Sequence, residues 1–163
     1  MFLRKYKDSD FPALQSWVTD PELLFRFAGD NWSFPLSLDE VKRYQDANTN
    51  KQSYILCDDS GIPVAFGELI IKEPHAPRLG RLLVGGSENR GKGIGTKLIN
   101  LMIAESRRNN TDPFIKLFVF DDNVDAIRCY KRIGFKFDEN VKLSISAPNG
   151  SLHQALLMVL DLN

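Results

Sequence analysis

Glycines and basic side chains gather in one short stretch of the chain, RGKGIGT at residues 90–96. Glycines let a chain turn so that successive amide N–H groups point into one concavity, where they can bind an anion. The helix predicted to follow would add its unpaired N-terminal amides and the positive end of its dipole. We therefore predict a phosphate or diphosphate site formed by Arg90, Gly91, Lys92, Gly93, Ile94, Gly95 and Thr96.

Other phosphate-binding loops fit this stretch less well. A Walker loop needs GxxxxGK followed by serine or threonine, and the glycines and Lys92 do not have that spacing. A dinucleotide fingerprint, GxGxxG, begins at Gly91 but is incomplete at Thr96. The remaining alternative is a flexible surface loop that precedes an ordinary helix.

A second pair of polar residues, Asn123 and Tyr130, lies in a run with helical periodicity. Seven residues separate them, which places them on one helix face about 10.5 Å apart along the axis. One extended ligand could therefore contact both side chains. The simpler alternative makes Asn123 an N-cap and Tyr130 a core aromatic residue with a hydrogen-bonded hydroxyl.

The elements that must position these residues follow from hydrophobic periodicity and turn residues. Strands are predicted at residues 2–6, 53–57, 62–71, 79–84, 114–120, 135–146 and 152–160. Helices are predicted around residues 11–17, after Pro21, and at 37–47, 95–108 and 123–133. This order predicts one α/β (α+β) domain over residues 1–163, in which helices flank a central mixed sheet of about seven strands. A helix between the strands at 79–84 and 114–120 makes these two strands parallel.

Composition excludes several classes of protein. The 163 residues include 43% hydrophobic residues, and 21 basic side chains balance 21 acidic ones, which argues against wholesale nucleic-acid binding. Neither a membrane span nor a secretory signal is visible, so we expect a cytoplasmic protein, monomeric or homodimeric. Cys57 and Cys129 are expected to be buried, and the few cysteines and histidines do not suggest a metal site.

Two motifs carry a resemblance to a known family. The stretch RGKGIG at 90–95 resembles the R/Q-x-x-G-x-G/A signature of the GNAT superfamily of N-acetyltransferases, and NVDAIRCYKRIGF at 123–135 resembles that superfamily's second motif. The order of predicted elements matches the GNAT fold over essentially the whole chain. The loop after Val84 and the ending at 150–158 resemble the branch that acetylates ribosomal-protein N-termini, polyamines and related amines.

The resemblance implies an enzyme that transfers an acetyl group from acetyl-CoA directly to a primary amine in a ternary complex. It implies that the loop at 90–96 holds the pyrophosphate and that backbone near Leu83 and Val84 binds the thioester carbonyl. It further implies that Asn123 hydrogen-bonds the pantetheine arm and that Tyr130 donates a proton to the departing thiolate. The alternative is a non-catalytic domain that binds acyl-CoA or a partner.

The catalytic base and the acceptor are less well defined. Many relatives place an acidic residue on the strand before the signature, where this chain has RLGR at 78–81. We therefore take Glu68 as the first candidate for the general base, with Glu73 and His75 next. Five aromatic residues between Trp17 and Phe34, together with seven acidic residues between positions 8 and 40, predict a cationic, partly apolar acceptor: a protein N-terminus or a small cationic amine.

Overall fold

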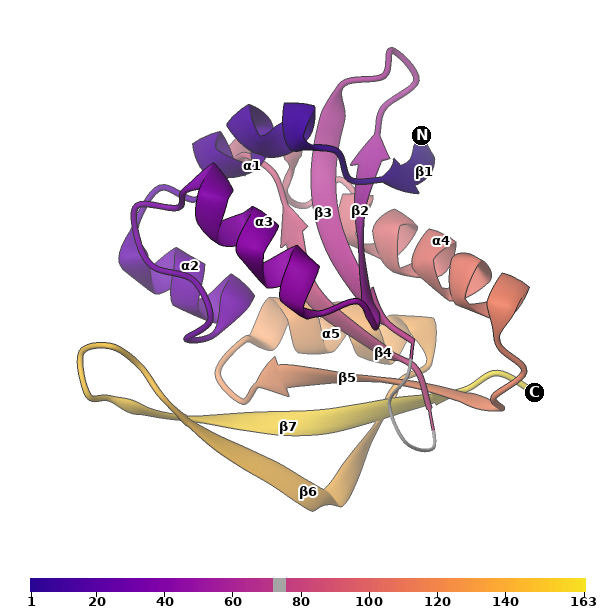
Figure 1. Ribbon diagram of the computed structural model, residues 1–163. Helices are drawn as coiled ribbons and strands as arrows, with labels where there is room; N and C mark the ends of the chain where they lie inside the picture. Colours follow the sequence, from indigo (N-terminus) through magenta and orange to yellow (C-terminus); the bar gives the residue numbers. More distant parts are fainter. Residues whose placement is uncertain (72–75) are drawn as a thin grey trace.

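The computed structural model describes residues 1–71 and 76–163, and a seven-stranded sheet forms its centre (Figure 1). The strands are β1 (Phe2–Lys5), β2 (Lys51–Cys57), β3 (Pro63–Ile70), β4 (Arg78–Val84), β5 (Phe114–Phe120), β6 (Lys136–Ser146) and β7 (Leu152–Asp161). The α-helices are α1 (Phe11–Trp17), α2 (Pro21–Ala28), α3 (Leu38–Ala47), α4 (Ile94–Asn109) and α5 (Val124–Ile133). The expected mixed sheet with flanking helices is confirmed.

The sheet opens between strands β4 and β5. Its order is β1-β2-β3-β4-β5-β7-β6, and all neighbours are antiparallel except β4 and β5, which are parallel as expected. These two strands pair only at Arg78 with Lys116 and at Leu79 with Leu117, and beyond that point they diverge (Figure 1). The β5-facing edge of β4 from Gly80 onward therefore has no ladder partner, which leaves backbone groups available in the opening.

Two hydrophobic cores lie on opposite faces of the sheet. Helices α1, α2 and α3 cover one face with a core that includes Leu14, Leu24 and Val41, while α4 and α5 cover the other with residues such as Leu98 and Met102 (Figure 1). In the described part of the chain, no helix is long and apolar enough to cross a membrane.

Helix α2 joins the two halves of the open sheet. Its residues Leu24 and Phe27 belong to the core beneath α1 and α3, whereas Phe25 stacks on Phe120 at the end of β5, with ring centroids 5.4 Å apart. Arg26 also forms an ion pair with Asp122, which follows β5, at 2.7 Å. The helix therefore contacts both sides of the opening.

Helix boundaries follow the capping residues of the sequence. Asp20 and Ser37 accept hydrogen bonds from amides in the first turns of α2 and α3, and Gly134 ends α5 in the left-handed conformation that glycine tolerates best. Before α1, Asp8–Asp10 forms a 3₁₀ helix, and Asp10 pairs with Arg4. One expectation is wrong: Cys129 is only partly buried.

Close packing explains the glycine at position 85. A Cβ atom at Gly85 would lie 2.1 Å from the indole of Trp17, a rigid ring that must then move. We expect Gly85→Ala to lower the free energy of unfolding by about 1–3 kcal/mol, the usual cost of overpacking. Gly80→Ala is the matched control, because its Cβ would make only ordinary contacts at 3.6 Å and 3.9 Å. Urea melts should separate the variants, and equal stability would contradict this packing.

Candidate functional site

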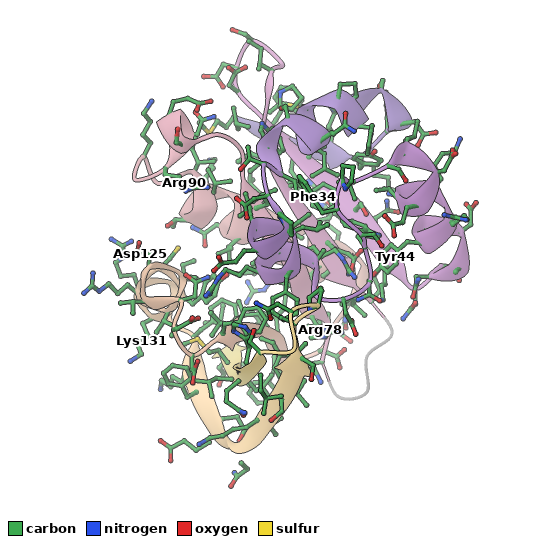
Figure 2. All side chains as sticks on the ribbon, turned by 90° about the vertical axis from the view of Figure 1, so that its left-hand side faces the viewer. Phe34, Tyr44, Arg78, Arg90, Asp125 and Lys131 are labelled. Carbon is green, nitrogen blue, oxygen red and sulfur yellow. The ribbon has the colours of Figure 1, made fainter. Side chains whose placement is uncertain are left out.

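A cleft of about 1230 Å³ runs between α4 and α5, and we call it the α4–α5 cleft. It is lined by the end of β4, the glycine loop, the first turns of α4 and most residues of α5. In Figure 2, Arg90 lies on the loop before α4, whereas Asp125 and Lys131 lie on α5, across this opening. Of the predicted cofactor residues, those that line it are Leu83, Val84, Arg90, Gly91, Gly93, Ile94, Gly95, Thr96 and Tyr130.

The glycine loop has the backbone conformation that an anion site needs. Gly91 and Gly93 have φ values of 73° and 77°, in the left-handed region, and Gly93 is the N-cap of α4. The 16-residue helix α4 begins at Ile94, so its first amides lie at the mouth of the α4–α5 cleft. Asn89 supports the loop by donating a hydrogen bond to the carbonyl of Gly85 at 2.8 Å.

Two of the predicted cofactor residues lie elsewhere. The side chain of Lys92 is exposed and does not line the α4–α5 cleft. Asn123 caps α5, since its Oδ1 accepts a hydrogen bond from the Ala126 amide at 3.3 Å, and it lines the neighbouring cleft instead. The capping role proposed as the simpler alternative is thus present, and a contact with the pantetheine arm stays a prediction.

A second cleft, of about 610 Å³, lies on the other side of the opening, and we call it the α2 cleft. The end of α2 and the residues after it, the diverging parts of β4 and β5, and β6 and β7 line this cleft. Leu82 and Tyr130 line both clefts, so the two cavities meet at these side chains. A ligand in one cleft can therefore reach a ligand in the other at this point.

Tyr130 is buried at the point where the two clefts meet. Its side chain is 9% exposed and its ring packs against Phe135, with centroids 6.1 Å apart. Burial raises the pKa of the Tyr130 hydroxyl above its usual value, and the nearby Cys129 adds to the shift. The hydroxyl therefore stays protonated at neutral pH. No described residue forms a hydrogen bond with it, so the alternative of a core tyrosine with a bonded hydroxyl finds no support there.

Strand β4 carries a bulge where the two clefts meet. Phe66 pairs with Leu83 and Glu68 with Gly80, so Arg81 and Leu82 have no partners in the register. Arg81 has φ 47°, which is uncommon for a residue other than glycine and costs on the order of 1 kcal/mol or more. The bulge lies just before Leu83 and Val84, where the resemblance implies that backbone binds the thioester carbonyl.

Contacts of the Arg81 side chain hold this strained conformation. Its guanidinium donates to Glu68 at 2.6 Å and lies over the rings of Tyr44 and Trp32, at 4.3 Å and 5.0 Å from their centroids. Glu68 is fully buried, so the alternative of a solvent-facing residue is wrong. Arg81 was not among the residues predicted for the site. A charged residue inside the apolar run of β4 was the available signal.

Glu68 does not itself line either cleft. Its Oε1 accepts hydrogen bonds from Arg81 and from the hydroxyl of Tyr44, whereas its Oε2 is buried without a partner among the described residues. It lies opposite Gly80, which lines the α2 cleft, and a Cβ atom on Gly80 would come within 3.9 Å of Oε1. The other two candidates for the base, Glu73 and His75, lie outside the described residues.

The acidic residues of the N-terminal region have mostly structural partners. Asp8, Asp10 and Glu22 form ion pairs, while Asp20 and Glu40 accept hydrogen bonds from backbone amides. Among the described residues of this run, only Asp30 lines the α2 cleft. Most of the aromatic residues are core residues too, and of the five only Phe27 lines the cleft.

Comparison with known proteins agrees with this geometry. Residues 11–135 match the model of the Acetyltransferase (GNAT) family, and the chain belongs to that family. A mycothiol acetyltransferase of Mycobacterium leprae is 32% identical over 97 residues, which cover 48% of this chain and 31% of that protein. This chain spans less than half the length of the curated relatives that it matches first.

Solved structures share the fold over nearly the whole chain. A spermidine N-acetyltransferase from Vibrio cholerae in complex with CoA and spermine has a TM-score of 0.81 at 19% identity, covering 99% of this chain and 95% of that one. A ribosomal-protein-alanine N-acetyltransferase from Brucella melitensis has a TM-score of 0.76 at 18% identity, covering 99% of this chain and 100% of that one. At these identities the likeness establishes the fold.

Proposed function

We propose that this protein transfers an acetyl group from acetyl-CoA to a primary amine. Family membership and the glycine loop support acetyl-CoA as the cosubstrate, with its pyrophosphate on the amides from Arg90 to Thr96 and its thioester near Leu83 and Val84. The observation that carries the proposal is the meeting of two clefts at Tyr130, because direct transfer requires both substrates at one point.

The reaction then takes place where the clefts meet. The deprotonated amine in the α2 cleft attacks the thioester carbonyl carbon, a C–N bond forms, and the C–S bond breaks with its electron pair on sulfur. Unpaired backbone of β4 after Gly80 can donate to the developing oxyanion. Tyr130 donates its proton to the thiolate, and the proton lost by the amine goes to a base.

The test compares turnover with binding. Thiol release from acetyl-CoA is measured with a panel of amines, and mass spectrometry identifies the acetylated product. We expect thiol release that depends on the presence of the amine. CoA binding without release for any amine, peptide or polyamine would instead support a non-catalytic acyl-CoA-binding domain, the alternative considered from the sequence.

Glu68 stays our candidate for the base, supported by its position opposite Gly80 and by its buried Oε2, which has no partner among the described residues. We expect Glu68→Gln to lower turnover at acidic and neutral pH, with recovery at high pH, where the amine loses its proton unaided. The change also removes the counter-ion of Arg81, so stability should fall by about 3–5 kcal/mol. Activity is therefore expressed per folded molecule. If the pH–rate profile of Glu68→Gln keeps the shape of the parent profile, Glu68 is not the base and only holds Arg81 in place.

A further inference from the structure

The α2 cleft has an uneven set of charges. The ionisable residues that line it, apart from Tyr130, are Arg26, Asp30, Lys51, Arg78 and Arg81, four basic side chains and one acidic one among the described residues. Asp30 is exposed, whereas Arg81 retains only 9% of its side-chain exposure. An acceptor in this cleft therefore meets mainly positive side chains.

The carboxylates that pair with Arg26 and Arg81 lie behind these two arginines. Arg26 is bound by Glu22 and Asp122, and Arg81 by Glu68, but none of the three acids lines the cleft. Such pairs fix the guanidinium groups in place. Since each guanidinium has five N–H donors, pairing with a carboxylate on one side leaves donors for a ligand on the other.

Two details point to an anionic ligand rather than a solvated surface. The guanidinium of Arg78 lies 5.7 Å from the ring centroid of Phe118 on β5, which holds it against the wall of the cleft. Ser144 and Ser146 on β6 line the same cleft and offer hydroxyl donors.

We propose that the acceptor is a small primary amine that also carries an anionic group, a carboxylate or a phosphate, bound by the basic side chains of the α2 cleft. This inference rests on the proposed acetyl transfer to an amine. A cavity of about 610 Å³ is of the size that small-molecule sites have. A polyamine would instead place its additional positive charges beside Arg26, Lys51, Arg78 and Arg81.

Matched amines provide the test. Lysine differs from cadaverine, and ornithine from putrescine, by one carboxylate, and O-phosphoethanolamine differs from ethanolamine by one phosphate. We expect kcat/KM to be about 10- to 100-fold higher for the anionic member of at least one pair, the size of a charge-assisted hydrogen bond. The pair with the larger ratio distinguishes a carboxylate from a phosphate.

Arg78→Gln should reduce that ratio toward one. The control is Lys42→Gln, which removes an equal charge from an exposed pair with Asp8 outside the cleft and should leave the ratio unchanged. Calorimetric binding of each amine to the CoA-bound protein supplies a readout that needs no turnover. It should show the same preference and the same loss in Arg78→Gln.

The outcomes separate this inference from the proposed function. Faster turnover of cadaverine, putrescine or ethanolamine than of their anionic partners would overturn the inference and leave acetyl transfer intact. If no amine releases thiol, the proposed acetyl transfer is wrong, and the calorimetric comparison tests the cleft alone. Tighter binding of the anionic amines then supports the inference, and equal or weaker binding overturns it.

Discussion

Tyr130→Phe should lower kcat by on the order of 10² or more, the usual scale for loss of a general acid. The change removes only a hydroxyl at the point where the two clefts meet, and no described residue is hydrogen-bonded to that hydroxyl. CoA affinity and thermal stability should therefore stay close to those of the parent protein. Because burial raises the pKa of Tyr130, its deprotonation should not lower kcat within the usual range of assay pH.

Tyr54→Phe is the matched control for this experiment. Tyr54 is a buried tyrosine of β2 whose hydroxyl donates to Glu105 at 3.4 Å, and it lines neither cleft. Removal of this hydroxyl should lower the free energy of unfolding by up to about 1 kcal/mol and leave kcat per folded molecule unchanged. Steady-state kinetics and thermal melts on the same preparations compare the two. Full kcat in Tyr130→Phe would show that another group protonates the leaving thiolate.

Gly93→Asp should weaken CoA binding by on the order of 10²-fold or more. The Cβ position at Gly93 is open, so the protein itself has room for the side chain, and aspartate tolerates the left-handed conformation better than most residues. The loss comes from a carboxylate placed at the entrance of the predicted diphosphate site, because apposed like charges cost several kcal/mol.

Gly150→Asp isolates this charge effect from backbone strain. Gly150 has φ 84° and open space at its Cβ position, as Gly93 does, but it lies in the turn between β6 and β7. Both variants should lose a similar, small amount of stability, and only Gly93→Asp should lose CoA affinity by calorimetry. Parent-like affinity in folded Gly93→Asp would remove the diphosphate from this loop.

Most of the fold could be predicted from local sequence. Periodicity, capping residues and turn glycines act over a few positions. The strand predicted at 114–120 and the helix end predicted at Gly134 therefore agree with the structure. The glycine loop was predictable for the same reason, since its backbone conformation depends on its own residues.

Features that depend on pairing between distant segments could not be predicted in this way. The ion pair of Glu68 with Arg81 requires the register of β3 on β4 and the bulge that turns the arginine toward the acid. The cationic acceptor stays a prediction, and caps and ion pairs occupy most of the carboxylates of the acidic run at 8–40 on which it was based. The basic lining of the α2 cleft comes instead from α2, β2 and β4, which are far apart in sequence.

The position of α2 bears on how substrate choice can evolve in this scaffold. Residues 26–31, at and after the end of this helix, contribute six side chains or backbone positions to the α2 cleft and none to the α4–α5 cleft. Substitutions there can therefore alter the acceptor while the cofactor site keeps its sequence. The aromatic stack of Phe25 on Phe120 anchors the helix independently of these residues, so new specificities can arise without rebuilding the fold.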